Sequence, residues 1–453
     1  MKRNFRSLVA MLLALVMVLA ACSPKSGDSK ESTGEKSGDN KKPATALKCS
    51  ITVQAEEPWK AYYEETIKRI QKDNPDAKIE LKIAGSFEHL EVIDKTDAKN
   101  KDVADVFAIP ADRFDGLKQN EVLAALPAQE MAKELGGFKD YDKGLGGAFK
   151  VENDYLAFPY NIETLITFVN TKNAEAQGID HKKALDLAEI KDPANVLLPL
   201  SNAWFGVSPN LAGKLEFLAK DGNKFKSTYT QEYAKLTDEQ KTVFENMYKY
   251  WKLHNEAKTS LFDKDASGGY VDKEFTTGNK GVARLDGPWA TSGDSIIAKE
   301  IKAGNVEIYP INHLKIAGKE FSHWKGGWAL VANSRIEEDK DKMALAVAFI
   351  KELVKPERAI DLYKATGKIL ENAELKQYKD SDLSDTDKKV VENVLKSYEV
   401  STPRPLFKEY GQVWNTWENS VLSWNASKPA KAEDAYNAVK AAFEAMMQQI
   451  SQQ

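Results

Sequence analysis

The chain contains nine tryptophans, and three of them stand where a ligand could reach them. Trp204 follows the apolar run in "LLPLSNAWFG", Trp289 follows a predicted strand and turn in "RLDGPWAT", and Trp414 lies in "GQVWNTWENS". Flat indole rings suit the apolar faces of pyranose sugars, which can stack on them. These three positions therefore predict stacking platforms for a sugar.

A sugar also presents hydroxyl groups, which need carboxylates or a guanidinium group at the ring edge for directed hydrogen bonds. Candidates lie close to predicted strand ends: Glu56 and Glu57, Asp112 and Arg113 in "ADRFDGL", and Glu163 in "PYNIETL". Stacking platforms combined with a few directed polar groups are typical of a small-molecule site. We expect these residues and the three tryptophans to form one ligand-binding site.

Each feature also has a simpler structural interpretation. A tryptophan is more often part of the core than a ligand contact, and Trp414, Trp417 and Trp424 fall on one stripe of a predicted helix. Trp328 stands on a predicted strand, where we expect it to be buried. A neighbouring pair such as Asp112 and Arg113 is usually solvated and contributes little energy. What favours a binding site is that the candidates share a position after strands.

Motifs for catalysis and for metal binding are absent from the sequence. It has no HExxH, GxSxG, CxxC or P-loop pattern. The five histidines show no spacing typical of metal ligands: His89, His181, His254, His313 and His323. We expect no cofactor, no metal and no enzymatic activity.

The elements that would position this site follow from the hydrophobic pattern. Residues 47–56 alternate as a strand, a helix follows and stops at Asn74-Pro75, and "KIELKIAG" and "VADVFAIP" predict two further strands. Strands separated by helices imply an α/β fold with a parallel sheet. Ligands bind such sheets at the carboxyl ends of the strands. The roughly 400 residues after the amino-terminal segment exceed one core, so we expect two lobes.

Later segments extend the same pattern. "YLAFPYNIETLITFVNT" predicts two strands with a bend at Pro159, and helices are expected to dominate residues 185–255. Strands are also predicted in "KGVARLDGPWA", "VEIYPI" and "WKGGWALVANS". "DKMALAVAFIKELV" predicts an apolar helix, and the tail from Ser381 is expected to be helical.

The amino-terminal segment predicts export and lipid attachment. Lys2, Arg3 and Arg6 precede an apolar run from Leu8 to Ala21 that is too short to span a bilayer. A positive head, a short apolar core and small residues at the end are typical of a bacterial export signal. "LAAC" resembles the lipobox of bacterial lipoproteins, in which Cys22 becomes the lipid-modified first residue.

Residues 22–46 then form a predicted flexible tether, because they contain no apolar side chain larger than alanine. With Cys22 lipidated, Cys49 has no cysteine partner within the chain. Cleavage of residues 1–21 removes three cations and makes the formal charge more negative than its value of −4. An acidic chain of mixed charge is not expected to bind nucleic acid.

Four segments carry a resemblance to a known family: "DVFAIPADRFDGLKQNEVLAAL", "YLAFPYNIETLITFVNT", "EFTTGNKGVARLDGPWA" and "HWKGGWALVANSRIEEDKDKMALAVAFIKELV". They resemble the extracellular solute-binding proteins of carbohydrate ABC importers, and among these the maltose/maltodextrin-binding group. The third resembles the family's "F-x-x-G-x-x-A-x-x-x-x-G-P-W" signature and is the most specific. The resemblance extends from about Ile51 to the carboxyl terminus.

The resemblance implies a two-lobed periplasmic-binding-protein fold of type II, with the ligand between the lobes. It implies a first lobe of residues 47–160 and 312–367, and a second of residues 161–311 and 368–453. Crossovers are expected near residues 159–161, 309–312 and 367–369. Trp204, Trp289 and Trp414 would be the sugar platforms.

The function expected from this resemblance is capture of an oligosaccharide of the maltodextrin type by hinge closure. The lipid-anchored protein would work on the extracellular face of a Gram-positive-type cell membrane and deliver the sugar to an ABC permease. Two alternatives stay open. The same fold could bind an amino acid or polyamine, with Asp112 and Arg113 as a charge clamp, or the chain could be a surface glycan hydrolase that uses two carboxylates across a cleft.

Overall fold

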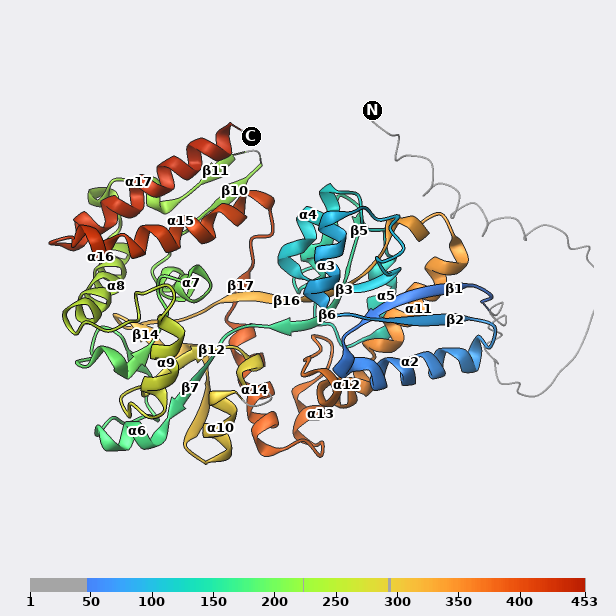
Figure 1. Cartoon of the computed structure of the whole chain (residues 1–453), viewed down its shortest axis with the longest axis horizontal. Helices are drawn as coiled ribbons and strands as arrows, with labels where there is room; N and C mark the ends of the chain where they lie inside the picture. Colours follow the sequence, from blue (N-terminus) through green and yellow to red (C-terminus); the bar gives the residue numbers. More distant parts are fainter. Residues whose placement is uncertain (1–46, 223, 292–294, 453) are drawn as a thin grey trace, which may run out of the picture. The chain divides into compact units, whose positions relative to one another are not determined.

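The first sheet begins with the strand–helix succession that the sequence predicts. The computed structural model describes residues 47–222, 224–291 and 295–452, so the export signal and the tether with Cys22 lie outside the described residues. The succession is β1 (Ser50–Ala55), α2 (Lys60–Asp73), β2 (Lys78–Ile83), α3 (Ser86–Lys95) and β3 (Val106–Pro110). β1 pairs in parallel with both β2 and β3, which confirms the predicted parallel arrangement for these strands (Figure 1).

A strand from late in the chain completes this sheet. β16 (Trp324–Ala332) pairs antiparallel with β3 and with β6 (Phe158–Glu163). Its first residues pair in parallel with the short β17 (Thr402–Pro403). The sheet order is β17-β16-β3-β1-β2, with β6 also on β16, so the complete sheet is mixed rather than parallel.

Alternation along β3 divides the first sheet between two hydrophobic clusters. Val106 and Ala108 belong to the cluster that contains the buried faces of α2 and α11 (Lys340–Leu353). Phe107 and Ile109 belong to the cluster that contains the buried face of α3. Because successive side chains of a strand point to opposite faces, helices cover both faces of this sheet.

A second sheet has the order β13-β7-β12-β9. Its strands are β7 (Ile166–Asn170), β9 (Val196–Leu197), β12 (Ala283–Asp286) and β13 (Val306–Pro310). β7 is antiparallel to both neighbours, whereas β12 and β9 are parallel. α14 (Asp385–Glu399) packs against β13 and β7.

Only Thr164 and Leu165 separate β6 in the first sheet from β7 in the second. The predicted break between two strands at Pro159 is wrong, because Pro159 lies inside β6 opposite Ala329. The register shifts there and leaves Tyr160 as the extra residue of a bulge, where a strand accommodates proline. The first predicted crossover, at residues 159–161, therefore falls within β6. The lobe boundaries themselves stay a prediction.

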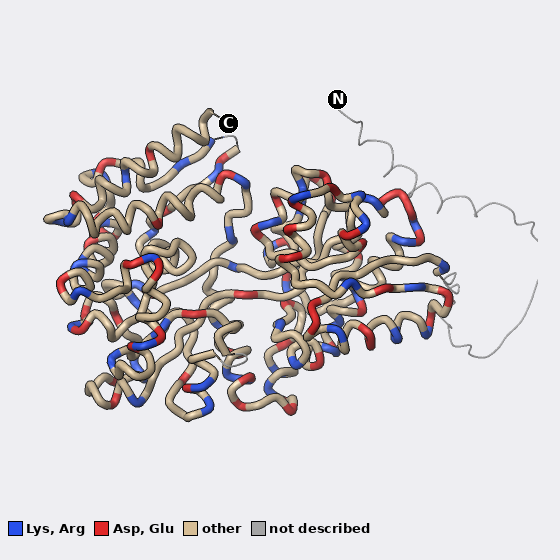
Figure 2. The backbone as a smooth tube through the Cα atoms, viewed as in Figure 1, with Lys and Arg blue, Asp and Glu red and all other residues tan. Residues whose placement is uncertain are grey.

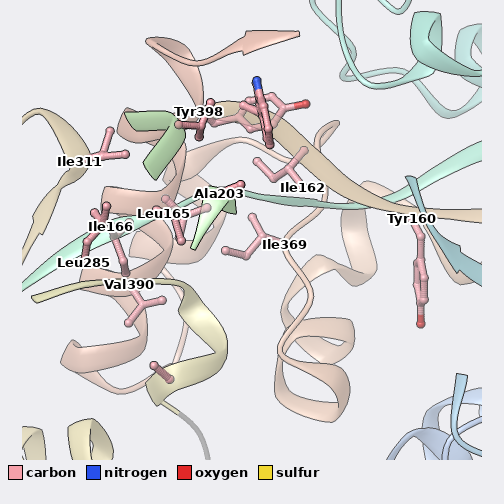
Figure 3. Packing of buried hydrophobic residues seen from close by; sticks show 14 of the residues in the cluster. Tyr160, Ile162, Leu165, Ile166, Ala203, Leu285, Ile311, Ile369, Val390 and Tyr398 are labelled. Carbon is pink, nitrogen blue, oxygen red and sulfur yellow. The ribbon is translucent and has the colours of Figure 1, made fainter. Parts of the chain in front are cut away.

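Buried apolar side chains pack around this connection. Leu165 and Ile166 are fully buried, and Ile162 bridges to Ile369, which comes from a distant part of the chain. Figure 3 shows these side chains with Ala203 and Leu285 close by. The connection between the two sheets is thus part of the hydrophobic core.

Further α-helices complete the described part of the fold. They are α4 (Phe114–Gln119), α5 (Ala128–Leu135), α6 (Thr171–Ala176), α7 (Ala203–Ala212), α8 (Asp238–Glu256), α9 (Ser267–Phe275), α10 (Ile296–Lys302), α12 (Ala359–Thr366), α13 (Leu375–Lys379), α15 (Gly411–Leu422), α16 (Trp424–Ser427) and α17 (Ala432–Ser451). The helical tail predicted from Ser381 is confirmed.

Short strands form three further small sheets. These pair β15 (Lys319–Glu320), β14 (Leu314–Ile316) and β8 (Leu185–Asp186); β10 (Ala219–Asp221) and β11 (Lys224–Lys226); and β4 (Lys150–Val151) and β5 (Asp154–Tyr155). Residues 185–255 therefore contain short strands as well as the long predicted helices.

Charged residues of both signs are interspersed along the described backbone (Figure 2). None of the described helices combines the length and the apolar character that crossing a membrane requires.

Candidate functional site

A pocket of about 270 Å³ gathers four of the eight predicted ligand contacts. We call it the aromatic pocket. It is lined by Phe87, Pro110, Asp112, Glu163, Trp204, Gly327, Trp328, Arg404 and Trp414. The structure therefore brings together Asp112, Glu163, Trp204 and Trp414, which lie far apart in the sequence.

Two helices and one buried ring position Trp204 and Trp414, two of the predicted sugar platforms. Trp204 is the second residue of α7, whose first turn is capped by the side chain of Asn202. Trp414 lies in the first turn of α15. The buried Trp324 contacts both, with ring centres 6.0 Å from Trp204 and 5.8 Å from Trp414. The platforms thus rest on a rigid aromatic support.

A buried histidine fixes the backbone at Trp204. His323 Nε2 donates to the carbonyl oxygen of Trp204 at 2.8 Å, and the two rings meet edge to face at 4.4 Å. Burial lowers the pKa of His323 to about 3, so its imidazole is neutral at physiological pH. A neutral ring can be buried here without the cost of desolvating a charge.

Arg404 lies against the platforms and reaches the first sheet. The pairing of β17 with β16 places it next to the strand that carries Trp324. Its guanidinium carbon lies 5.0 Å from the ring centre of Trp204 and 5.7 Å from that of Trp414. Arg404 Nη2 donates to Asp112 Oδ2 at 3.0 Å. A cation–π contact and an ion pair together hold one side chain across the pocket.

Glu163 lines the aromatic pocket and interacts electrostatically with Lys368, which lies beside the pocket against the ring of Trp328. Burial raises the pKa of the Glu163 carboxyl, although the ammonium of Lys368 opposes this rise. Burial lowers the pKa of Lys368, against the opposing charges of Glu163 and Glu56. The ammonium lies 4.7 Å from the ring centre of Trp59 and 4.8 Å from that of Trp328. Burial disfavours the charged form of both groups, and the opposite charge of each partner stabilises the other.

The other four predicted contacts do not line the aromatic pocket. Glu56 accepts a hydrogen bond from Ser86 Oγ at 2.7 Å, and Glu57 is exposed at the start of a short 3-10 helix. Arg113 Nη2 donates hydrogen bonds to both carboxylate oxygens of Asp94. Their roles as ligand contacts stay predictions.

Trp289 is 45% exposed and directly follows the turn after β12. Its ring folds over Gly287, because a Cβ atom at that glycine would lie 2.2 Å from the ring. The aromatic pocket does not include this ring. The role of Trp289 as a platform stays a prediction.

Sequence reasoning missed four side chains at this site. Phe87 follows β2 and meets Trp328 edge to face at 5.4 Å, and Phe87 is 62% exposed. The expectation that Trp328 is buried is wrong, because this half-buried ring lines the pocket. Arg404 and Lys368 are the other two. Of these four, only Phe87 lies just after a predicted strand, which is the signal by which the predicted site residues were chosen.

The described residues contain no group of three or more histidine, cysteine, aspartate or glutamate side chains that could hold a metal ion. The aromatic pocket combines two carboxylates, one guanidinium group and four aromatic rings. This arrangement can stack a flat apolar face and hydrogen-bond the groups at its edge.

Comparison with known proteins adds a family and several similar structures. The family model described as bacterial extracellular solute-binding protein matches residues 65–390. No curated protein matches this chain by sequence.

The maltose-binding periplasmic protein MalE from Listeria monocytogenes, solved with maltose, has 19% identity and a TM-score of 0.65, and the match covers 88% of this chain and 98% of that one. MalX from Streptococcus pneumoniae, solved with maltopentaose, has 20% identity and a TM-score of 0.62 over 87% and 99% of the two chains. The extracellular solute-binding protein from Staphylococcus aureus, solved with maltose, has 17% identity and a TM-score of 0.63 over 89% and 98%. At such identities the likeness shows the fold, which confirms the predicted two-lobed α/β fold.

Proposed function

Since the chain belongs to the bacterial extracellular solute-binding proteins, we propose that it captures an oligosaccharide of the maltodextrin type. The observation that carries this proposal is the aromatic pocket, in which Trp204 and Trp414 lie beside two carboxylates and Arg404. The similar structures solved with maltose and maltopentaose support the choice of ligand class.

The pocket fits the two kinds of surface that a sugar presents. The faces of Trp204 and Trp414 would take the C–H face of successive glucose rings. Asp112 and Glu163 would accept hydrogen bonds from hydroxyl groups, and these bonds gain strength where water is excluded. Phe87 would add a third apolar contact from the first lobe, because it is exposed on the pocket wall.

Closure of the two lobes would complete the site. A ligand that contacts both lobes only in the closed form shifts the population toward that form. Glu56, Glu57, Arg113 and Trp289 are proposed to reach the sugar in this state. The lobes would be residues 47–160 with 312–367, and residues 161–311 with 368–453.

Delivery and location complete the proposal. Cys22 would carry the lipid that holds the protein on the extracellular face of the membrane, and the closed form would dock on the subunits of an ABC permease. The protein would bind its ligand without turnover, with no cofactor, and without nucleic acid as a partner.

A titration of the protein without its tether tests this proposal through its tryptophan fluorescence. The ligands are maltose, longer maltodextrins, other oligosaccharides, amino acids and polyamines. We expect a saturable change with maltodextrins, because Trp204 and Trp414 would lose solvent contact. A response to an amino acid or polyamine alone would overturn the proposal, and release of glucose during the titration would indicate a hydrolase.

A further inference from the structure

A second cavity adjoins the aromatic pocket. It has a volume of about 630 Å³ and is lined by residues of segments 142–148 and 403–406 together with Lys325. Arg404 lines both cavities. A ligand seated on Trp204 and Trp414 therefore has this second space nearby.

Three cations line this second cavity, Lys143, Lys325 and Arg404, together with the carboxylate of Asp142. Lys143 pairs with Asp140 at 2.8 Å, which leaves Lys325 and Arg404 as the cations to consider. Asp142 is already engaged, because it accepts hydrogen bonds from Gln129 Nε2 at 2.8 Å and from the hydroxyl of Tyr155. We call this space the cationic pocket.

Two of these cations have capacity left for a ligand. Arg404 is 9% exposed, and its hydrogen bond to Asp112 uses one of five N–H donors. Lys325 lies over the ring of Tyr398 at 5.5 Å. Its charge opposes the rise that burial causes in the pKa of the Glu371 carboxyl. Glu371 also accepts hydrogen bonds from the Leu145 N–H group at 3.0 Å and from Tyr398, so the Lys325 ammonium keeps donors for a ligand.

A guanidinium group with N–H donors beyond those of its ion pair can take a further acceptor. Neutral hydroxyl groups would satisfy it only in part, whereas a carboxylate or phosphate matches its planar fork with two parallel hydrogen bonds. Lys325 adds a second positive charge on the same cavity. Water can fill the space in the free protein, but an anionic group gains from both charges.

We infer that the cationic pocket is a second subsite, which takes an anionic substituent of the bound oligosaccharide. The substituent is a carboxylate, as in a uronic acid unit, or a phosphate ester. Its oxygens meet Arg404 and Lys325 while the neighbouring sugar ring stacks on Trp204. The inference rests on the proposed function, because the sugar platforms bring the anion to the subsite.

Calorimetric titration of the full chain tests the subsite. The ligands are maltotetraose, maltotetraose with one glucuronate unit, maltotetraose 6-phosphate and inorganic phosphate, each at low and at high salt. We expect the two acidic oligosaccharides to bind at least tenfold more tightly than maltotetraose at low salt. The preference is expected to shrink at high salt, because ions screen the two cations.

Two variants test whether the cationic pocket causes the preference for acidic oligosaccharides. Lys325→Gln is expected to reduce the acidic-over-neutral affinity ratio about tenfold. Lys99→Gln is the matched control, since Lys99 is an exposed lysine that lines neither pocket, and it is expected to leave the ratio unchanged. A ratio that survives Lys325→Gln overturns the inference.

The outcomes separate this inference from the proposed function. Equal affinity for neutral and acidic oligosaccharides overturns the subsite and leaves the proposed function intact. Binding of acidic oligosaccharides alone supports the subsite and removes neutral maltodextrin as the ligand. Binding of inorganic phosphate alone, or of none of the four ligands, overturns both.

Discussion

Arg404 Nη2 donates a hydrogen bond to Asp112 Oδ2 at 3.0 Å, and this contact joins residues 292 positions apart. Asp112 follows β3 in the first sheet, whereas Arg404 lies on Trp204, which belongs to α7. The pair therefore links the two sides of the aromatic pocket. It also sets a condition for binding, because a sugar on Trp204 must share the ring with the guanidinium group or move it aside.

Asp112 should matter for affinity rather than for stability. The variant Asp112→Asn keeps the shape but removes the charge that accepts hydrogen bonds from a sugar, so we expect affinity for maltotetraose to fall about tenfold, as for loss of a charged hydrogen bond. Asp272→Asn is a matched control, because Asp272 also pairs with an arginine, Arg284, lines neither pocket and has 43% exposure against 44% for Asp112. Calorimetric titration of both variants decides the point. Equal affinities for the two variants would contradict a role for Asp112.

The two platform tryptophans should each be required for tight binding. Trp204→Ala and Trp414→Ala remove a stacking face. We expect each to weaken maltotetraose binding by about tenfold to a hundredfold, by analogy with nucleobases, whose stacking on an aromatic side chain contributes ~1–3 kcal/mol. Trp204→Phe retains an aromatic face and should lose less. Thermal unfolding of each variant checks that the fold is intact. An unchanged dissociation constant for both alanine variants would show that these rings serve packing alone.

Trp289 tests whether closure adds a platform that the aromatic pocket does not include. We expect Trp289→Ala to weaken oligosaccharide binding strongly and to leave the unfolding temperature unchanged, because the ring is 45% exposed. The measurement is the same titration as for Trp204. An affinity equal to that of the unmodified protein would remove Trp289 from the site.

Local patterns predicted the elements well, because burial on one face leaves a period in the sequence. Alternation identified β1 and β2, an apolar run identified β3, and helical spacing identified α2 up to its stop at Asn74. The predicted break at Pro159 was wrong because β6 accommodates this proline through a bulge opposite β16. β16 begins only at Trp324, far along the chain. No signal near Pro159 reports that pairing.

The same contrast, between local patterns and pairing of distant strands, explains which residues of the candidate site could be predicted. Asp112 and Glu163 were predictable because each lies at or just after a strand end, where ligands of α/β folds bind. Arg404 was not, because its place on Trp204 depends on the two-residue strand β17 pairing with β16. Trp328 was assigned to the core from its strand, yet this position of β16 reaches the pocket wall. Residues placed by distant pairings need the tertiary structure.

Cys22 should hold the protein on the membrane. Cys22→Ser removes the thiol that the lipid would modify, so we expect the protein to move from the membrane fraction to the medium. Fractionation of cells that express each form, followed by immunoblotting, measures this. Because the change lies outside residues 47–452, maltodextrin binding should not change. Retention of the serine variant in the membrane fraction would contradict lipid attachment at Cys22.

Three buried histidines should make the fold sensitive to mild acid. Burial lowers the pKa of His89 to about 4, and that of both His254 and His323 to about 3. The case of His89 is clear, because its Nε2 accepts a hydrogen bond from the N–H group of Ala104 at 2.9 Å, which a protonated nitrogen cannot do. Its neutral form is therefore part of the folded structure.

The sign of the pH effect follows from this lowered pKa. Above pH ~6.5 His89 is neutral in both the folded and the unfolded states, and its contribution to stability is fully present. Below that value the unfolded state binds the proton more readily. The free energy of unfolding should then fall by about 1.4 kcal/mol per pH unit for this residue until the pH nears 4.

The variant His89→Gln isolates this effect from all other titrating groups. The amide oxygen of glutamine can still accept the hydrogen bond from Ala104 but carries no titrating proton. Urea unfolding of both proteins from pH 7.5 to pH 5 gives the difference in free energy of unfolding. We expect this difference to be constant above pH 6.5 and to shift in favour of the variant as the pH falls. Parallel curves over the whole range would show that His89 does not carry the acid sensitivity.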